Sequence, residues 1–364
     1  MRVVLLGAGH IGQTIAQWLA ASGDYRITVV DRSAEALAKL AGRGIATIAA
    51  DTDSEQRLRE VMRDHDTVIN ALPYFLATMV ATQARDVGCH YFDLTEDIAA
   101  THTIMRLADG ANTVFMPQCG LAPGFIGIVA HHLTREFDTL HDVKMRVGAL
   151  PAFPTNALKY NLTWSVDGLI NEYCHPCEAI RDGERFDVLP LEGLEHFSLD
   201  GVEYEAFNTS GGLGTLCETL AGRVRALDYK SVRYPGHCAL MRFLLEELQM
   251  KAHQESLKEI LRRSIPATMQ DVVLVFVTVS GTKRGQLMQE VFARKIFAER
   301  SETAPLSAIQ ITTAAGVCAA VDLFREGRLP QRGFVRQEQI DLPAFLENRF
   351  GRAYQQSRQI ESIY

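Results

Sequence analysis

The stretch MRVVLLGAGHIGQTIAQWLAASGDYRITVVDR, residues 1–32, decides the fold. It opens with a short apolar run, Val3 to Leu6, which predicts a buried β-strand. Three glycines follow in G-x-G-x-x-G spacing, and the apolar residues after them recur with the period of a helix. A second apolar strand then ends at Asp31. This order of strand, glycine turn, helix, strand and acid predicts a dinucleotide-binding fold.

Each part of this pattern has a physical role toward a dinucleotide. Gly7 allows the sharp turn, Gly9 lets the backbone approach a pyrophosphate, and Gly12 lets the helix pack closely on the strand. The pyrophosphate then meets the free N–H groups at the start of the helix. Asp31 can accept hydrogen bonds from the adenosine ribose, and its charge repels a 2′-phosphate. We therefore expect NAD rather than NADP, although Arg32 could hold a 2′-phosphate.

The alternation of strand and helix continues to about residue 120. Four more strands are expected, within residues 44–51, 66–73, 89–97 and 112–120. Six strands alternating with helices predict an α/β fold with a parallel, doubly wound sheet. Ligands of such sheets bind at the carboxyl ends of the strands. The residues expected to bind the cofactor are Gly7, Gly9, His10, Ile11, Gly12, Asp31, Arg32, Asp51, Asn70, Ala71, Leu72 and Pro73. Asp51 could instead cap the next helix, and Asn70 could either bind the cofactor or cap a helix.

Composition narrows the class of protein. The chain has 364 residues, of which 47% are hydrophobic and 22% charged, as expected of a globular protein with about two domains. The formal charge of −7 and the lack of a Lys/Arg-rich block argue against a nucleic-acid partner. No apolar run reaches the ~18 residues of a membrane span, and no signal-peptide pattern is present. We expect a cytoplasmic protein without membrane contact.

The seven cysteines are scattered, which does not indicate a disulfide framework. Cys174 and Cys177 have C-x-x-C spacing, but a zinc site needs a second pair, and none exists. We expect no metal site, and interpret this stretch as a tight turn between two strands.

Beyond residue 136 the strict alternation ends. Strands are expected within residues 142–150, 158–166, 177–182, 184–190, 204–210, 271–281 and 287–298, and helices within 235–250, 254–265 and 307–326. These elements predict a mixed α+β domain, followed by small-residue helices that return to the first domain. The expected boundaries are a Rossmann domain at 1–122, a substrate and oligomerisation domain at 123–306, and C-terminal helices at 307–364.

Several short motifs follow one another in order along the chain: GAGHIG (7–12), VINALP (68–73), DLTED (93–97), CGLAPG (119–124), WSVDGLINEY (164–173), EAFNTSGG (205–212) and LDYKSVRYPGH (227–237). Together they resemble the saccharopine dehydrogenase-like family, and within it the lysine 6-dehydrogenases. The resemblance runs from residue 1 to the NRFG at 348–351. GxGxxG is generic, whereas CGLAPG and RYPGH are far more specific.

The resemblance implies a small amino-acid substrate, a nicotinamide cofactor and a homodimer or larger homo-oligomer. The reaction it implies is NAD-dependent oxidation of L-lysine at the ε-carbon, giving ammonia and 2-aminoadipate 6-semialdehyde, which cyclises. Saccharopine and carboxyspermidine-type dehydrogenases of the same family remain alternatives. A non-catalytic NAD(P)-binding sensor or structural protein is an alternative of another class, because a fold alone does not prove activity.

The implied chemistry needs a base, a water activator and a group that holds the substrate carboxylate. Asp93 and Glu96 follow the fifth strand, where the nicotinamide is expected, and are the catalytic candidates. Asp93 could instead cap the following helix. The expected substrate-binding residues are Arg233, His237, Tyr160, Thr209, Ser210 and Gly124. Arg233 would clamp the carboxylate and His237 would move protons near neutral pH, unless they are a structural ion pair and a structural histidine.

The stretch CGLAPG joins the sixth strand to the next helix. Its glycines and proline predict a second bare helix N-terminus, at Leu121 to Gly124, near the nicotinamide and substrate. A helix N-terminus lowers the pKa of a nearby thiol. The hydride chemistry needs no nucleophile, however, and we interpret Cys119 as a small packing residue.

Overall fold

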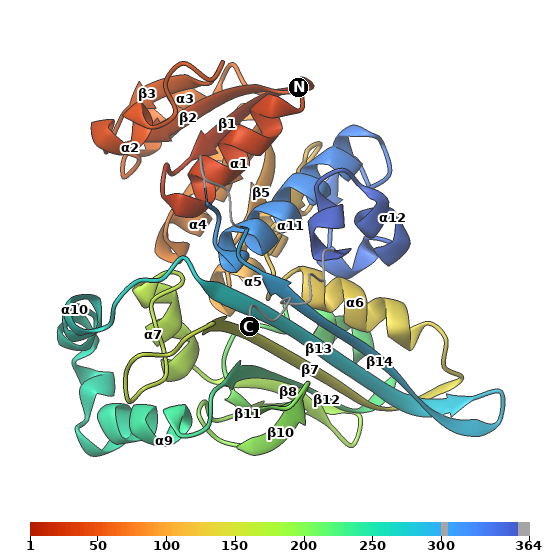
Figure 1. The fold of residues 1–364 in the computed structure, drawn as a ribbon. Coiled ribbons are helices and arrows are strands. Elements are labelled where there is room, and N and C mark those ends of the chain that lie inside the picture. The colour runs from red at the N-terminus through yellow and green to blue at the C-terminus, as the bar shows by residue number, and fades with distance from the viewer. Residues whose placement is uncertain (300–304, 356–364) are drawn as a thin grey trace. The chain divides into compact units, whose positions relative to one another are not determined.

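The computed structural model describes residues 1–299 and 305–355, and the chain divides into two compact units (Figure 1). The first unit comprises Met1–Ile128 and Thr313–Ala353, so a C-terminal segment completes the N-terminal domain. The second comprises Val129–Thr312 together with Tyr354. The helix α6 (Phe125–Thr134) runs from the first unit into the second.

The first unit is a parallel sheet in the strand order β15-β6-β5-β4-β1-β2-β3. The six strands expected from the sequence are all present, in the Rossmann order, and a seventh from the C-terminal segment joins one edge. Its strands are β1 (Arg2–Leu6), β2 (Arg26–Asp31), β3 (Ala46–Ala49), β4 (Thr67–Asn70), β5 (His90–Asp93), β6 (Val114–Met116) and β15 (Gly333–Phe334). The helices between them are α1 (His10–Ala21), α2 (Ala34–Ala38), α3 (Glu55–Met62), η1 (Tyr74–Leu76), α4 (Ala77–Val87) and α5 (Ile98–Ala108).

The pattern of apolar residues explains this sheet. The central strand β1 is buried from Val3 to Leu6, as a parallel strand covered on both faces requires. Helices α3, α4 and α5 pack their apolar residues against one face in a single core that includes Leu58, Val80 and Ile104. This arrangement fixes the carboxyl ends of the strands, where the cofactor site is expected.

The C-terminal segment packs back through α11 (Ala308–Arg325), η4 (Gln337–Gln339), α12 (Leu342–Glu347) and η5 (Gly351–Gln355). α11 is the one described helix that is long and apolar enough to cross a membrane, but 89% of it is buried inside the protein. Its small residues serve close packing. A Cβ on Gly316 would lie 2.5 Å from the carbonyl oxygen of Cys119, so the helix backbone approaches the loop after β6 directly.

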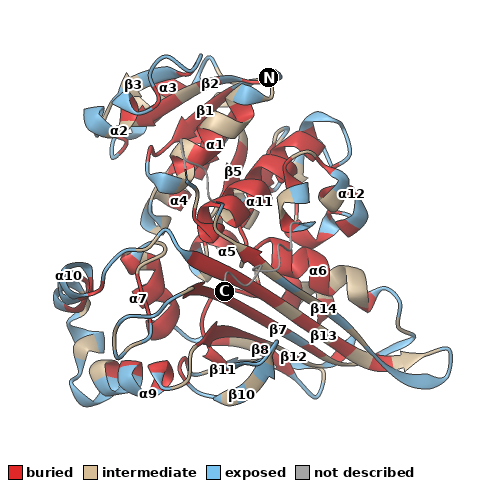
Figure 2. Ribbon diagram, in the orientation of Figure 1, coloured by how far each residue is buried: buried red, intermediate tan, exposed pale blue. Residues whose placement is uncertain are grey.

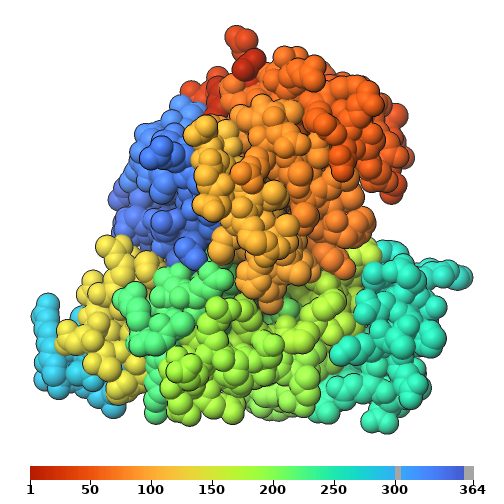
Figure 3. Space-filling model, turned by 180° about the vertical axis from the view of Figure 1, so that it is seen from behind, coloured from red at the N-terminus to blue at the C-terminus, as the bar shows by residue number. Residues whose placement is uncertain are grey.

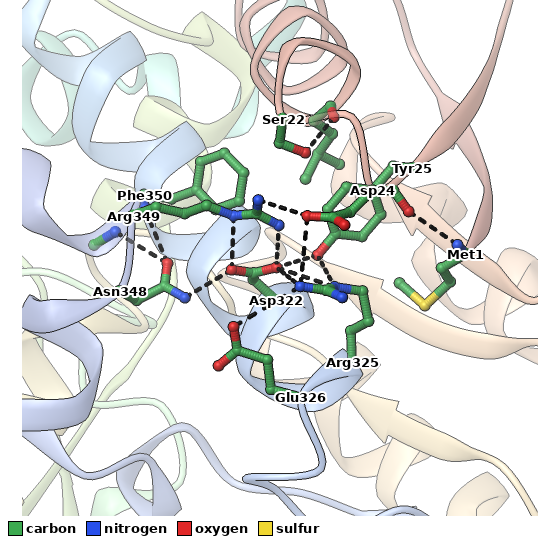
Figure 4. A network of polar contacts seen from close by, with 12 residues as sticks. Met1, Ser22, Asp24, Tyr25, Asp322, Arg325, Glu326, Asn348, Arg349 and Phe350 are labelled. Carbon is green, nitrogen blue, oxygen red and sulfur yellow. Dashed lines mark hydrogen bonds and ion pairs between the residues drawn. The ribbon is translucent and has the colours of Figure 1, made fainter.

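A buried carboxylate holds this segment to the N-terminal strands (Figure 4). Asp322 of α11 accepts hydrogen bonds from the Tyr25 hydroxyl (2.6 Å), the Asn348 amide (2.9 Å) and the Arg349 guanidinium (2.7 Å). Burial alone would raise the pKa of Asp322, but the hydrogen bonds from Arg349, Tyr25 and Asn348 hold it below its ordinary value. The network joins the start of β2 to the chain's last described helices.

The second unit is a mixed sheet in the order β10-β11-β12-β7-β13-β14, with β8 and β9 attached through β12. Its strands are β7 (Thr139–Pro151), β8 (Cys177–Arg181), β9 (Glu184–Val188), β10 (Glu195–Leu199), β11 (Val202–Asn208), β12 (Val224–Arg233), β13 (Asp271–Lys283) and β14 (Gln286–Phe297). Its helices are α7 (Val166–Cys174), α8 (Leu216–Leu220), α9 (His237–Arg242), the π-helix η2 (Phe243–Glu247), η3 (Met250–Ala252) and α10 (Gln254–Ser264).

Two sequence predictions for the second unit are wrong. Residues 158–166 form no strand, because the Asn156 side chain bonds the backbone of Tyr160 and the intervening Lys159 has a positive φ. The stretch from Cys174 to Cys177 joins helix α7 to strand β8 rather than two strands. The strands β10 and β12 were not expected.

Candidate functional site

The glycine turn after β1 has the geometry that a dinucleotide requires. Gly7 has φ +103°, and a Cβ there would lie 2.8 Å from the carbonyl oxygen of Ala71. A Cβ on Gly12 would lie 2.0 Å from the Gly7 oxygen, so only glycine allows α1 to pack there. Gly9 differs, because a Cβ on it would meet nothing within 4 Å. The protein itself does not require glycine at position 9, whereas a pyrophosphate approaching the backbone does.

The N-terminus of α1 is open. Gly9 occupies the N-cap position in an extended conformation, and no described side chain caps it. Gly9 and His10 are exposed, and Ile11 is half-buried. The N–H groups at the start of a helix, together with the helix dipole, attract a phosphate. The residues present therefore fit a dinucleotide.

Asp31 lies at the carboxyl end of β2, next to this turn. Its two carboxylate oxygens accept the N–H groups of Ala8 (2.6 Å) and Ser33 (2.8 Å). It remains partly exposed, and each oxygen has a further lone pair for a ribose hydroxyl. Arg32 is exposed beside it. Asp51, after β3, is exposed and accepts the N–H of Asp53 (3.2 Å).

The loop after β4 borders the glycine turn. The Asn70 side chain is buried, accepts the N–H of Leu72 (3.2 Å) and donates to the Tyr91 hydroxyl (3.4 Å). The N–H of Ala71 donates to Leu6, and Pro73 begins the short helix η1. Asn70 therefore shapes this loop through its side chain, and the backbone of Ala71 faces Gly7.

Asp93 is fully buried at the end of β5. One carboxylate oxygen accepts the Tyr91 hydroxyl (2.6 Å), and the other accepts the N–H groups of Thr95 (3.0 Å) and Gln118 (2.8 Å). Burial raises the pKa of Asp93 to about 6, although these hydrogen bonds oppose the rise. The carboxylate joins β5 to the loop after β6, and Gln118 takes a positive φ of 67° to reach it. In this position Asp93 stabilises the loop after β6. Its catalytic role stays a prediction.

Glu96 lies three residues further on and differs from Asp93 in its surroundings. Its side chain is half-buried and makes no hydrogen bond to another described residue, whereas neighbouring Asp97 caps α5 by accepting the N–H of Ala100 (2.7 Å). Burial raises the pKa of Glu96 to about 7, and the nearby Asp97 and Asp93 add to the rise. A partly accessible carboxylate with a pKa near neutrality has the properties of a general base.

The loop from Cys119 to Gly124 does not present a bare helix N-terminus, contrary to the sequence-based expectation. The first N–H groups of α6, on Phe125 and Ile126, already donate to the carbonyl oxygens of Gly120 and Leu121 (3.0 Å each). The reason is the tightness of the loop: a Cβ on Gly124 would lie 2.2 Å from the Gly120 oxygen. Gly124 is buried and enables this close approach.

Cys119 is a packing residue, as expected. It is 1% exposed, its thiol lies 3.1 Å from the Met116 carbonyl oxygen, and the Gln337 amide donates to its sulfur (3.0 Å). Burial raises the pKa of Cys119, so the thiol is not activated.

In the second unit, Arg233 ends β12 as a buried cation. Its Nε donates to the Tyr173 hydroxyl (3.0 Å) and its Nη1 to the Val232 carbonyl oxygen (2.8 Å). Its guanidinium carbon lies 5.2 Å from the centre of the Tyr160 ring and 5.9 Å from that of Tyr173. It forms no ion pair with a described residue, although the nearby buried Glu172 raises its pKa electrostatically.

The hydrogen bonds around His237 have only one possible direction. The Leu158 carbonyl oxygen can only accept, so His237 donates to it from Nδ1 (2.9 Å). Arg233 can only donate to Tyr173, so we assign the tyrosine hydroxyl as donor to His237 Nε2 (3.1 Å). Burial and the charge of Arg233 lower the pKa of His237 to about 3. His237 is neutral at physiological pH and positions Tyr173, which differs from the expected proton transfer near neutrality.

The remaining substrate candidates lie in the same unit. Tyr160 is buried beside Arg233, the Thr209 hydroxyl bonds the Ser231 hydroxyl (2.8 Å), and the N–H of Ser210 donates to the Glu172 carbonyl oxygen (3.0 Å). Tyr173, which bonds both Arg233 and His237, was not among the expected residues. Its signal was the helical spacing of apolar residues in WSVDGLINEY, which places Val166, Ile170 and Tyr173 on one face.

Among the described residues, no group of three or more His, Cys, Asp or Glu side chains could hold a metal ion.

Comparison with known proteins agrees with this geometry. Residues 3–114 match the family model of the saccharopine dehydrogenase NADP binding domain, and residues 120–352 match that of the saccharopine dehydrogenase C-terminal domain. The chain is 27% identical over 194 residues to saccharopine dehydrogenase [NADP(+), L-glutamate-forming] of Saccharomyces cerevisiae, a match that spans 50% of this chain and 42% of that protein. The chain therefore covers less than half the length of this relative.

The fold is also that of a solved structure. The apo saccharopine dehydrogenase (L-Glu forming) from Saccharomyces cerevisiae superposes with a TM-score of 0.76 at 18% identity, over 93% of this chain and 94% of that one. At this identity the likeness concerns the fold alone. The family models cover nearly the whole chain, in order and across both units, and the chain thus belongs to the saccharopine dehydrogenase family.

Proposed function

We propose that the protein is a nicotinamide-dependent oxidoreductase that oxidises L-lysine at its ε-carbon, releasing ammonia and 2-aminoadipate 6-semialdehyde. Membership of the family supports oxidation of a C–N bond with a nicotinamide cofactor. The open N-terminus of α1 and the unfilled space at Gly9 support binding of the dinucleotide.

The observation that carries the substrate proposal is the charge of Arg233. The buried cations in the described part of the second unit are Arg146, Lys230, Arg233 and Lys258. All but Arg233 form ion pairs with acidic residues of the protein. The buried Glu172 acts on Arg233 electrostatically without forming an ion pair with it, and a substrate carboxylate would give this guanidinium a direct partner. A single such cation suits lysine, which carries one carboxylate.

In the proposed reaction, the ε-ammonium group loses a proton and the ε-carbon loses a hydride, which leaves an iminium ion. Water then adds to the iminium carbon, and the carbon–nitrogen bond breaks to give the aldehyde and ammonium. The nicotinamide, when bound, is the hydride acceptor. Glu96 takes the proton from the substrate ammonium and later from the attacking water. Its pKa of about 7 allows it to accept and release protons at neutral pH.

We propose NAD as the cofactor, because the carboxylate of Asp31 lies beside the glycine turn where a 2′-phosphate would be repelled. The relative from Saccharomyces cerevisiae is named for NADP(+), and the exposed Arg32 would favour it.

A second candidate is saccharopine oxidation with formation of L-glutamate, the reaction for which that relative is named. Saccharopine carries two more carboxylates than lysine. It would require further cations besides Arg233, which the buried positions of the described second unit do not offer.

The experiment is a substrate panel with the purified protein. L-lysine, saccharopine and polyamines are each supplied with NAD or NADP, and reduced cofactor, ammonia and glutamate are measured. The proposal predicts reduced cofactor and ammonia in equal amounts with lysine. Glutamate release from saccharopine without turnover of lysine would establish the second candidate. Cofactor binding without turnover of any substrate would indicate a non-catalytic NAD(P)-binding protein.

A further inference from the structure

A cleft of about 590 Å³ opens on the first unit, at the amino ends of two strands of its parallel sheet. The strands β6 and β15 begin there as a parallel pair, with Gly333 beside Val114. In Figure 3 the blue C-terminal segment lies directly beside the amber residues that follow α5. The dinucleotide is expected at the opposite, carboxyl ends of the strands. The proposed reaction therefore makes no use of this cleft.

Apolar residues line part of the cleft. Met105 of α5 and Phe334 of β15 are both half-buried, and Ala108, the last residue of α5, is buried. A partly covered apolar surface of this kind gains free energy when an alkyl group covers it further, because both surfaces are removed from water. The cleft can therefore hold the hydrocarbon part of a small ligand.

Two opposite charges line the same cleft without bonding one another. Asp109 directly follows α5, Arg332 directly precedes β15, and both are exposed. Figure 2 shows α11 buried along nearly its whole length, whereas the residues just beyond its end are exposed. Neither the Asp109 carboxylate nor the Arg332 guanidinium forms a hydrogen bond or an ion pair with another described residue. Both charges are therefore available to a ligand.

The end of α5 makes its side of the cleft more negative. The helix ends at Ala108, and a helix C-terminus carries partial negative charge that attracts a cation. Arg106, the basic residue of the last turn, donates to the Thr103 hydroxyl (2.8 Å) and does not line the cleft. Asn112 is exposed and also lines it, with an amide that can both donate and accept. The cleft thus has one anionic side and one cationic side.

We propose that this cleft binds a free α-amino acid as a zwitterion, at a site separate from the one that carries the proposed reaction. The α-carboxylate accepts hydrogen bonds from the Arg332 guanidinium, and the α-ammonium group donates to the Asp109 carboxylate. An alkyl side chain covers Met105 and Phe334. A simple anion or a simple cation would pair with only one of the two charges, whereas a zwitterion pairs with both.

The test is isothermal titration of the full chain with L-norleucine, in the absence of nucleotide. Norleucine is an α-amino acid with an unbranched alkyl side chain and no ε-amine, so the proposed reaction cannot consume it. We expect a dissociation constant on the order of 1 mM or lower. Hexanoate is the same molecule without the α-ammonium group, and pentylamine is the same molecule without the carboxylate. Each should bind about tenfold more weakly or worse, because one charged hydrogen bond is lost.

The variants Asp109→Asn and Arg332→Gln locate the binding. Each neutralises an exposed side chain that bonds no other described residue, so urea unfolding should match that of the wild type. Each should raise the dissociation constant of norleucine by about tenfold or more. Asp109→Asn should not weaken the binding of hexanoate, which has no ammonium group. Arg328→Gln is the matched control and should bind norleucine like the wild type, because Arg328 is exposed in the same segment but lines a different cleft.

An absence of norleucine binding at millimolar concentrations overturns the proposal. Binding that neither Asp109→Asn nor Arg332→Gln weakens also overturns it, and loss of that binding in Arg233→Gln would place norleucine in the second unit instead. Hexanoate or pentylamine that binds as tightly as norleucine overturns the recognition of a zwitterion. These readouts do not depend on turnover, so failure of this proposal and failure of the proposed reaction are distinguishable.

Discussion

Asp93 and Glu96 lie three residues apart, and their carboxyl groups have different surroundings. Both pKa values are raised by burial, to about 6 and about 7. Asp93 accepts hydrogen bonds from Tyr91, Thr95 and Gln118 on its two carboxylate oxygens. A proton transfer to this carboxylate would therefore disturb the hydrogen bonds that stabilise the loop after β6. Glu96 has no such bonds to described residues, and can change its protonation without rearranging the fold.

Replacing each of the two acids by its amide is therefore expected to have different effects. Glu96→Gln should lower kcat by about 100-fold or more, because a general base contributes that much, while the unfolding midpoint stays unchanged. The base acts when deprotonated, so wild-type kcat/KM should rise with pH through about 7, and this rise should disappear in the variant. Steady-state kinetics over pH, with urea unfolding alongside, measures both.

Asp93→Asn is the matched comparison. Its remaining oxygen can still accept the N–H groups of Thr95 and Gln118, but its NH2 group cannot accept the Tyr91 hydroxyl, so we expect lower stability and a retained pH profile. If Glu96→Gln turns over like the wild type while Asp93→Asn loses its pH dependence without losing stability, the roles are reversed.

Cofactor choice is also decided at a single residue. Asp31→Ala should raise the dissociation constant of NAD about tenfold or more, because a hydrogen bond to a charged group is lost, and should change that of NADP less. Arg32→Ala is the control, and should weaken NADP alone. Isothermal titration with both nucleotides measures the four constants, and equal losses for NAD and NADP in Asp31→Ala would contradict the assignment.

At the scale of elements, the buried start of α11 depends on one acid from β13. Asp271 accepts the N–H groups of Ala308 (2.5 Å) and Ile309 (3.0 Å), while Ser307 and Gln310 bond each other's backbone in a capping box. Every N–H of the first turn thus has a partner.

Asp271→Ala should lower the free energy of unfolding by about 2 kcal/mol, because two buried N–H groups lose their acceptor. Urea unfolding measures this, with Glu326→Ala as a control at the exposed end of the same helix. A loss no greater than that of the control would show that the cap does not stabilise α11.

The sequence predicted elements well where the pattern was periodic. The strands β1 to β6 are short runs that alternate regularly with helices, and the helix α11 is a long apolar run, so their physical signal is local. The prediction of a strand at 158–166 is wrong because the Asn156 side chain competes for a backbone hydrogen bond there. Strand β12 was missed because Arg233, Lys230 and Asp228 interrupt its apolar pattern, and its partners are distant in sequence.

The roles of the site residues were less predictable than the strands and helices, because these roles depend on partners that are distant in sequence. The turn at Gly7 and the close helix packing at Gly12 follow from local geometry, and the structure has both. Asp93 is bonded to Gln118 of another loop, and the neutral state of His237 depends on its burial and on the charge of Arg233. Only tertiary contacts decide whether such a group is a base, an anchor or a positioning residue.

At the scale of the whole molecule, a dinucleotide unit built from two separate segments of the chain accompanies a mixed-sheet unit with one buried cation that forms no ion pair among the described residues. We propose that these units serve the oxidation of an amino acid with a single carboxylate.

The most direct test is the turnover of L-lysine with NAD by the purified protein, measured by reduced cofactor and released ammonia. We expect both products in equal amounts, and we expect Arg233→Lys to raise KM for lysine far more than it lowers kcat. Absence of reduced cofactor with lysine under either nucleotide, with saccharopine oxidised instead, would contradict the proposed reaction.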